Sequence, residues 1–142
     1  MDAFDLERFV TAQDEAGTFE RALGELRDGR KRSHWMWFVF PQVAGLGTSP
    51  TASRFAIASL GEALAYLAHP VLGDRLRSAA AAILAVPHAS ARDILGSVDA
   101  AKLQSSMTLF QVADPDEPLF GEALDRFFGG TPDPRTRGLL GA

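Results

Sequence analysis

The stretch SHWMWFVFPQVAGLG, residues 33–47, contains both tryptophans of the chain and two of its ten phenylalanines. Trp35–Phe40 is an unbroken apolar run, so periodicity alone does not separate a buried helix from a buried strand. Pro41 disfavours helical backbone at the residue before it, so a helix here ends by about Val39. Because no other segment offers strands to pair with, we expect a short helix capped by Ser33.

The composition around this stretch is that of an ordinary globular domain. The chain has 142 residues, of which 46% are hydrophobic and 23% charged, and it contains no cysteine. The lack of cysteine excludes disulfides and thiolate metal sites and fits a reducing compartment. The acidic, polar beginning predicts no signal peptide, and no apolar run approaches the roughly 18 residues of a membrane span. We therefore expect one domain over residues 1–142, cytoplasmic and not membrane-bound.

Helix signals occur on both sides of the aromatic stretch. Thr18 and Asp99 stand where N-caps are expected, and Gly24 interrupts a helical stripe. A glycine inside a helix costs about 1 kcal/mol relative to alanine, which indicates close packing at Gly24. The pattern predicts an all-α fold, a compact multihelical single domain of about seven to eight short helices. Apolar spacing and end signals favour helices within 2–13, 18–28, 49–58, 59–69, 71–86, 90–96, 100–112, 119–128 and 134–140.

Positive charge is concentrated just before the aromatic stretch. Arg27, Arg30, Lys31 and Arg32 face a single carboxylate, Asp28, although the formal net charge of the chain is −4. A local positive patch on an acidic protein suits a small anion better than a polymer. The overall charge therefore argues against nucleic acid as a partner.

The junction between the basic run and the aromatic run is the first candidate site. Residues 30–32 supply charge-assisted donors for phosphate or carboxylate, and Trp35 or Trp37 offers a flat face for stacking a ring. His34 lies between the two and is a candidate acid or base, with a hydrogen bond to a backbone carbonyl as the structural alternative. The alternative is structural: the cations form a solvated turn, and the aromatic residues are the centre of the core.

Two further segments carry polar groups that suit a site. Gln42, beside a glycine-rich turn, can recognise an amide or a base edge, although such turns are common in loops. In KLQSSMT, residues 102–108, Lys102 and Ser105 share a helix face, which allows a lysine-activated serine nucleophile. The alternative for Ser105 and Ser106 is a buried polar network or contact with a ligand. The three histidines have no metal-ligand spacing, so we expect no metal and no cofactor.

Several long motifs, in order from Asp5 to Leu140, resemble the bacterial domain-of-unknown-function 1810 family. They are DLERFVTAQ, SHWMWFVFPQVAGLG, EALAYLAHPVLGDRL, KLQSSMTLF and PDPRTRGLL. The resemblance implies a multihelical single-domain fold and brings no established activity. Many members carry the label "calpastatin", which denotes a calpain inhibitor. Such inhibitors are disordered, whereas this composition is that of a packed core, so the label is set aside.

Residue type, together with grouping in these motifs, predicts one pocket and two alternative functions. The first function is binding of an anionic small molecule, such as a nucleotide or an ADP-ribose derivative, with hydrolysis left open and His34 and Lys102 as candidate catalytic residues. The second is a non-enzymatic interaction module or homodimer, with the Phe127–Phe128 end among the contact surfaces. Whether the protein is an enzyme stays open. The predicted pocket residues are His34, Trp35, Trp37, Gln42, Lys102, Ser105 and Ser106.

Overall fold

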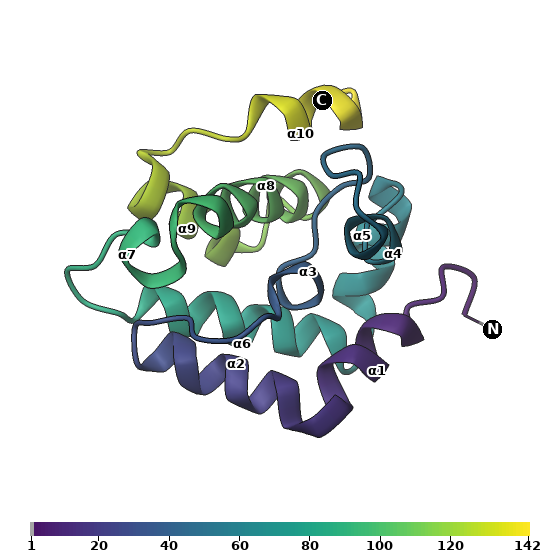
Figure 1. Cartoon of the computed structure of the whole chain (residues 1–142). Helices are drawn as coiled ribbons and strands as arrows, with labels where there is room; N and C mark the ends of the chain where they lie inside the picture. Colours follow the sequence, from purple (N-terminus) through teal and green to yellow (C-terminus); the bar gives the residue numbers. More distant parts are fainter. Residues whose placement is uncertain (1) are drawn as a thin grey trace.

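The longest helix, α8 (Ser97–Ala113), runs through the middle of the computed structural model, which describes residues 2–142. It contacts α5 (Leu60–Ala68), α7 (Ala91–Leu95), α9 (Pro118–Phe128) and α10 (Pro134–Leu140). Because neighbours surround it, α8 is buried on several faces, and its buried residues include Ser105, Ser106 and Thr108. Figure 1 shows α10 lying across the side of α8 opposite α6 (Leu72–Leu84).

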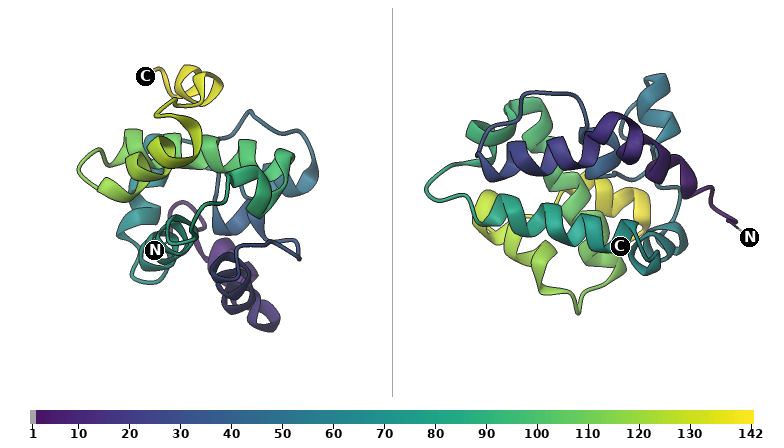
Figure 2. Two further views of the ribbon diagram at one scale, coloured as in Figure 1. Left: turned by 90° about the vertical axis from the view of Figure 1, so that its left-hand side faces the viewer. Right: turned by 90° about the horizontal axis from the view of Figure 1, so that it is seen from below.

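The N-terminal part of the chain forms the other outer layer. Helix α1 (Glu7–Asp14) continues through a 3₁₀ turn (Glu15–Gly17) into α2 (Thr18–Arg27), which packs along α6. The views in Figures 1 and 2 agree on an order of layers from α2 through α6 and α8 to α10. The core therefore lies on both sides of α6 and α8.

Two short helices, α3 (Met36–Val39) and α4 (Pro50–Arg54), flank the glycine-rich loop. The loop is closed by an isolated bridge in which Ala44 N donates to the carbonyl of Ile57 and Ile57 N donates to that of Gln42. Residues 2–142 contain ten α-helices, more than the seven to eight expected, and no strand longer than this bridge, so the predicted all-α fold is confirmed.

A row of aromatic side chains joins the layers through the core. Phe9 meets Tyr66 edge-on with ring centroids 5.1 Å apart, and Tyr66 meets Phe110 at 5.4 Å. Phe110 in turn contacts Phe120 at 5.8 Å. All four rings are fully buried, and burial raises the pKa of the Tyr66 hydroxyl above its ordinary value. Such contacts add specific geometry to ordinary hydrophobic burial.

Some predicted helix ends are confirmed and others are wrong. Ser49 and Ser90 cap their helices as expected. Ser33 does not cap α3, because its hydroxyl donates to Glu25 instead. Asp99 is not a cap either, since α8 begins two residues earlier, at Ser97.

The Thr18 cap is also wrong: Gly17, in the left-handed region at φ 67°, precedes α2, and Thr18 is its first residue. The expected close packing at Gly24 is likewise wrong, because a Cβ built there would have no neighbour within 4 Å. Both corrections leave the extent of α2 as predicted.

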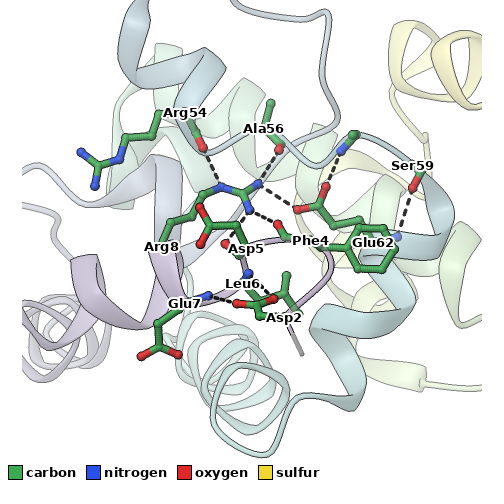
Figure 3. Close-up of polar contacts among 11 residues, drawn as sticks. Asp2, Phe4, Asp5, Leu6, Glu7, Arg8, Arg54, Ala56, Ser59 and Glu62 are labelled. Carbon is green, nitrogen blue, oxygen red and sulfur yellow. Dashed lines mark hydrogen bonds and ion pairs between the residues drawn. The ribbon is translucent and has the colours of Figure 1, made fainter.

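Arg8 fastens the start of the chain to the segment that closes the loop (Figure 3). Its Nε donates to the carbonyl of Arg54 at 2.7 Å, and its Nη2 donates to that of Ala56 at 2.9 Å and to the Glu62 carboxylate at 2.8 Å. Its Nη1 donates to the carbonyls of residues 4 and 5. The other Glu62 oxygen accepts the Ala58 N–H at 2.9 Å. With its donors used in this way, Arg8 supports the loop and is not a ligand-binding residue.

Candidate functional site

Three hollows meet around the half-buried ring of Trp37, on α3. Trp37 is the second residue of α3, which is a single helical turn. The first and last residues of this turn, Met36 and Val39, are buried. The turn therefore directs Trp37 toward the loop and α8 while its neighbours anchor the backbone. We name the hollows by their linings: the loop hollow, the polar hollow and the lysine hollow.

The loop hollow, of about 150 Å³, lies between Trp37 and the two sides of the loop, residues 42–47 and 52–56. Gln42 lies at its junction with the polar hollow and is 6% exposed. Within residues 2–142, the Gln42 Nε2 group has no hydrogen-bond partner. The backbone of Gly47 forms another part of the wall. A Cβ added at Gly47 would lie only 2.7 Å from Ala52 Cβ, so the position is too close to Ala52 for a side chain.

The polar hollow, of about 280 Å³, brings together four of the predicted residues. They are Trp37, Gln42, Lys102 and Ser105. Lys102 and Ser105 stand one helical turn apart on α8, as predicted, but the serine hydroxyl donates to Asp133 Oδ2 at 3.2 Å and to the carbonyl of Ala101. The lysine is directed elsewhere, so the two do not form a nucleophile–base pair.

Three polar residues of the polar hollow were not predicted from the sequence: Gln104, Asp133 and Arg135. The Asp133 Oδ2 atom accepts the Thr136 N–H at 3.0 Å and thereby caps α10. An aspartate directly before a proline that begins a helix is a common N-cap, so this local role accounts for Asp133 without a site. Its convergence with Gln42 and Lys102 is long-range, and the residue pattern carries no signal of it.

The lysine hollow, of about 150 Å³, lies on the other side of Lys102. Asp99 accepts hydrogen bonds from two lysines, with its Oδ2 2.9 Å from Lys31 Nζ and its Oδ1 3.1 Å from Lys102 Nζ. The Lys102 ammonium also lies 4.0 Å from the centroid of the Trp37 ring. Burial raises the pKa of Asp99, but the two lysines outweigh it and hold this pKa below its ordinary value.

Buried Glu25, on α2, fixes the segment in front of α3. It accepts the backbone N–H groups of Arg32 and Ser33, the Ser33 hydroxyl, and the indole N–H of Trp35 at 2.9 Å. Burial alone raises the pKa of Glu25, yet these donors lower it to about 2. Trp35 is 1% exposed and its N–H is used by Glu25, so it is held in the core, and it also lines the lysine hollow.

The predicted basic run does not gather at one place. Lys31 turns to Asp99, Arg32 pairs with Asp28 at 3.2 Å on the surface, and Arg30 is exposed. Of these three, only Lys31 lines one of the three hollows around Trp37.

The predicted single pocket is divided. His34 is exposed and lines the lysine hollow with Lys102, whereas Gln42 lines the polar hollow with Lys102. Ser106 is fully buried and lines none of the three hollows. Lys102 and Trp37 are therefore the residues that the polar hollow and the lysine hollow share.

Few features of the described residues support a metal site, a membrane-spanning helix or an aromatic contact surface. Within it, no three histidine or acidic side chains are grouped to hold a metal ion. Its helices include none with the length and apolar character needed to cross a membrane. Phe127 and Phe128, offered as a contact surface, are half-buried and contact each other with ring centroids 6.5 Å apart.

Comparison with known proteins gives a family and a solved relative. The model of the family "Protein of unknown function (DUF1810)" matches residues 3–140. The crystal structure of the conserved hypothetical protein Rv1873 from Mycobacterium tuberculosis is similar, with a TM-score of 0.94 and 49% sequence identity. The match covers 98% of each chain. No curated protein matches.

Proposed function

This chain belongs to the DUF1810 family of proteins of unknown function, and we propose that it binds an anionic small molecule in the polar hollow. A nucleotide or an ADP-ribose derivative has the required chemistry, which combines negative charge, polar groups and a ring. Four residues predicted from the sequence line this hollow, and Asp133 and Arg135 join them.

The buried amide of Gln42 carries the proposal. Buried polar groups in folded proteins are nearly always hydrogen-bonded, and an unpaired one costs about 1–3 kcal/mol. Gln42 Nε2 is unpaired within residues 2–142, and its residue lines two adjoining hollows. A ligand carbonyl, ring nitrogen or phosphate oxygen at this junction would supply the missing acceptor.

The charge around Lys102 supports an anionic ligand. Lys31 and Lys102 share a single carboxylate, so the trio retains one positive charge. An ammonium has three N–H donors, and Asp99 takes one from Lys102, which leaves donors for an anion. Arg135, exposed at the edge of the polar hollow, adds a second cation. A fork-shaped guanidinium suits phosphate and carboxylate groups.

The volumes suit a ligand of mononucleotide size. The polar hollow, of about 280 Å³, adjoins the loop hollow of about 150 Å³ along Trp37, Gln42, Leu46 and Gly47. Small-molecule sites commonly occupy about 300–1,000 Å³. The mainly apolar lining of the loop hollow suits a ring, with charged groups remaining in the polar hollow.

Hydrolysis is a separate part of the proposal. A role for His34 as acid or base requires a ligand long enough to pass Lys102 and reach the lysine hollow, at which His34 lies. A dinucleotide or an ADP-ribose derivative has that length, whereas inorganic phosphate does not. Product formation from ADP-ribose, compared in the wild-type protein and His34→Ala, tests this part.

Isothermal titration calorimetry tests the binding proposal with AMP, ADP-ribose, ribose 5-phosphate and pyrophosphate as probes. We expect binding that weakens about tenfold or more in Gln42→Leu and Lys102→Met, since each removes a donor to a charged group. Arg92→Met, at an exposed position on α7 that lines none of these hollows, is the control and should bind as the wild type does. Absence of binding to all four probes, or wild-type affinity in both Gln42→Leu and Lys102→Met, would contradict the proposal.

A further inference from the structure

We propose that Asp133 binds the vicinal hydroxyls of a ribose, so that the ligand of the polar hollow is a ribonucleotide or another ribose phosphate. This inference rests on the proposed function and names its ligand class. It concerns a residue that the sequence marks only as a helix cap.

Asp133 is fixed from three directions. Its backbone N–H donates to Thr108 Oγ1 at 2.9 Å, which ties it to the buried middle of α8. Its Oδ2 atom accepts the Thr136 N–H, the Thr136 hydroxyl and the Ser105 hydroxyl. Thr136 is fully buried, and Ser105 is 8% exposed. The carboxylate therefore has a set orientation before any ligand arrives.

These three side-chain contacts all use Oδ2, which leaves Oδ1 for the polar hollow that Asp133 lines. An ionised carboxylate oxygen only accepts hydrogen bonds. The part of a ligand that faces Asp133 must therefore present a donor. A phosphate or carboxylate group cannot fill this position.

The charges nearby decide which kind of donor fits. Lys102 and Arg135 line the same hollow, so an ammonium group of a ligand would meet two cations. Neutral hydroxyl groups do not incur that repulsion. In dinucleotide-binding folds, an acidic side chain accepts a hydrogen bond from the ribose 2′-hydroxyl in this way.

One molecule must therefore carry negative charge and hydroxyl donors a few ångströms apart. The cations Lys102 and Arg135 suit the negatively charged group of the ligand, and Asp133 suits its hydroxyl groups. Ser105 adds an acceptor, because its own proton goes to Asp133 or to the carbonyl of Ala101. A ribose phosphate has both groups on a single small ring.

The experiment compares AMP with 2′-deoxy-AMP by isothermal titration calorimetry on the wild-type protein and on Asp133→Asn, with pyrophosphate as a probe that lacks a sugar. We expect the wild type to bind AMP about tenfold or more tightly than 2′-deoxy-AMP, because one hydrogen bond to a charged acceptor is lost. In Asp133→Asn, the remaining oxygen can still cap α10, while the amide nitrogen replaces the acceptor. This variant should bind both nucleotides equally and retain pyrophosphate binding.

The exposed Asp125→Asn, on α9, is the matched control and should keep the preference for AMP. Equal affinity of the wild type for AMP and 2′-deoxy-AMP would overturn the ribose inference while leaving the proposed function intact. A preference that survives in Asp133→Asn would also overturn it. Failure of the wild type to bind any of the three probes would overturn both proposals. Because the two nucleotides are compared on the wild type, the test stands even if the variant does not fold.

Discussion

The ammonium of Lys102 lies 4.0 Å from the centre of the Trp37 ring, and the same ammonium is 3.1 Å from the Asp99 carboxylate. One face of Trp37 is therefore covered by a cation. The predicted stacking platform is half-occupied by the protein itself, and a ligand ring would meet the rest of the indole.

We expect this contact to stabilise the fold measurably. Lys102→Met and Trp37→Leu should each lower the free energy of unfolding in urea. A double-mutant cycle should give a coupling of about 0.5–1 kcal/mol, which is typical of a cation–π pair near the surface. Strict additivity of the two substitutions would contradict a direct interaction.

Gln42 and Gln13 should respond in opposite ways to replacement by leucine. Gln13 is 1% exposed, and its amide donates to the Phe38 carbonyl and the Tyr66 hydroxyl and accepts from Arg75. Gln13→Leu should therefore cost about 2–3 kcal/mol, because its partners are left unpaired.

Gln42→Leu removes an amide nitrogen that has no partner in residues 2–142, so it should leave stability unchanged or raise it by about 1 kcal/mol. Urea denaturation without ligand measures both variants. A large loss of stability in Gln42→Leu would mean that this amide has a structural role.

Glu25 should make stability fall at acid pH. The pKa of Glu25 is lowered from 4.5 to about 2, so its contribution is fully present above pH 4.5 and is lost as the pH falls toward 2. The loss should be on the order of 1–2 kcal/mol, since solvent near the exposed Arg32 screens part of the effect.

Unfolding free energies across this pH range should therefore converge for the wild type and Glu25→Gln. Glu20 is exposed on the same helix, and the unfolding free energy of Glu20→Gln should change with pH as that of the wild type does. If the difference in unfolding free energy between the wild type and Glu25→Gln stayed the same down to pH 2, the stabilisation would come from packing and not from the charge of Glu25.

Two helical glycines should give opposite results when replaced by alanine. An added Cβ at Gly24 meets nothing within 4 Å, so Gly24→Ala should stabilise the protein by about 0.5–1 kcal/mol. An added Cβ at Gly73 would lie 2.1 Å from the Leu67 carbonyl oxygen, and Gly73→Ala should cost about 3 kcal/mol or more. Thermal and urea unfolding measure both, and destabilisation by Gly24→Ala would indicate a contact that the fold does not show.

The helices were predictable because their signals are local. Ser49 and Ser90 cap the helices that follow them directly, and Pro41 ends α3 as its backbone requires. Two of the three wrong caps involve long-range contacts. Ser33 is drawn to Glu25 on another helix, and Asp99 is held by Lys31 from a distant segment.

Part of the site was predictable from residue type. Residue type alone indicated Gln42, Lys102 and Ser105, and the fold brings these three to one hollow. Residue type did not reveal that Trp35 is held in the core by Glu25 or that His34 lies in a separate hollow. Those outcomes depend on long-range contacts, because Glu25 on α2 holds the segment in front of α3.

The polar hollow takes its wall from residues as far apart in the chain as Trp37 and Arg135. No short fragment contains the site, so it exists only once α3, the loop, α8 and the start of α10 have assembled. A molecule bound there stabilises the whole fold against global unfolding, by an amount that grows with its concentration relative to its dissociation constant. Amide hydrogen exchange should then slow even in α2 and α6, whose described residues do not line this hollow.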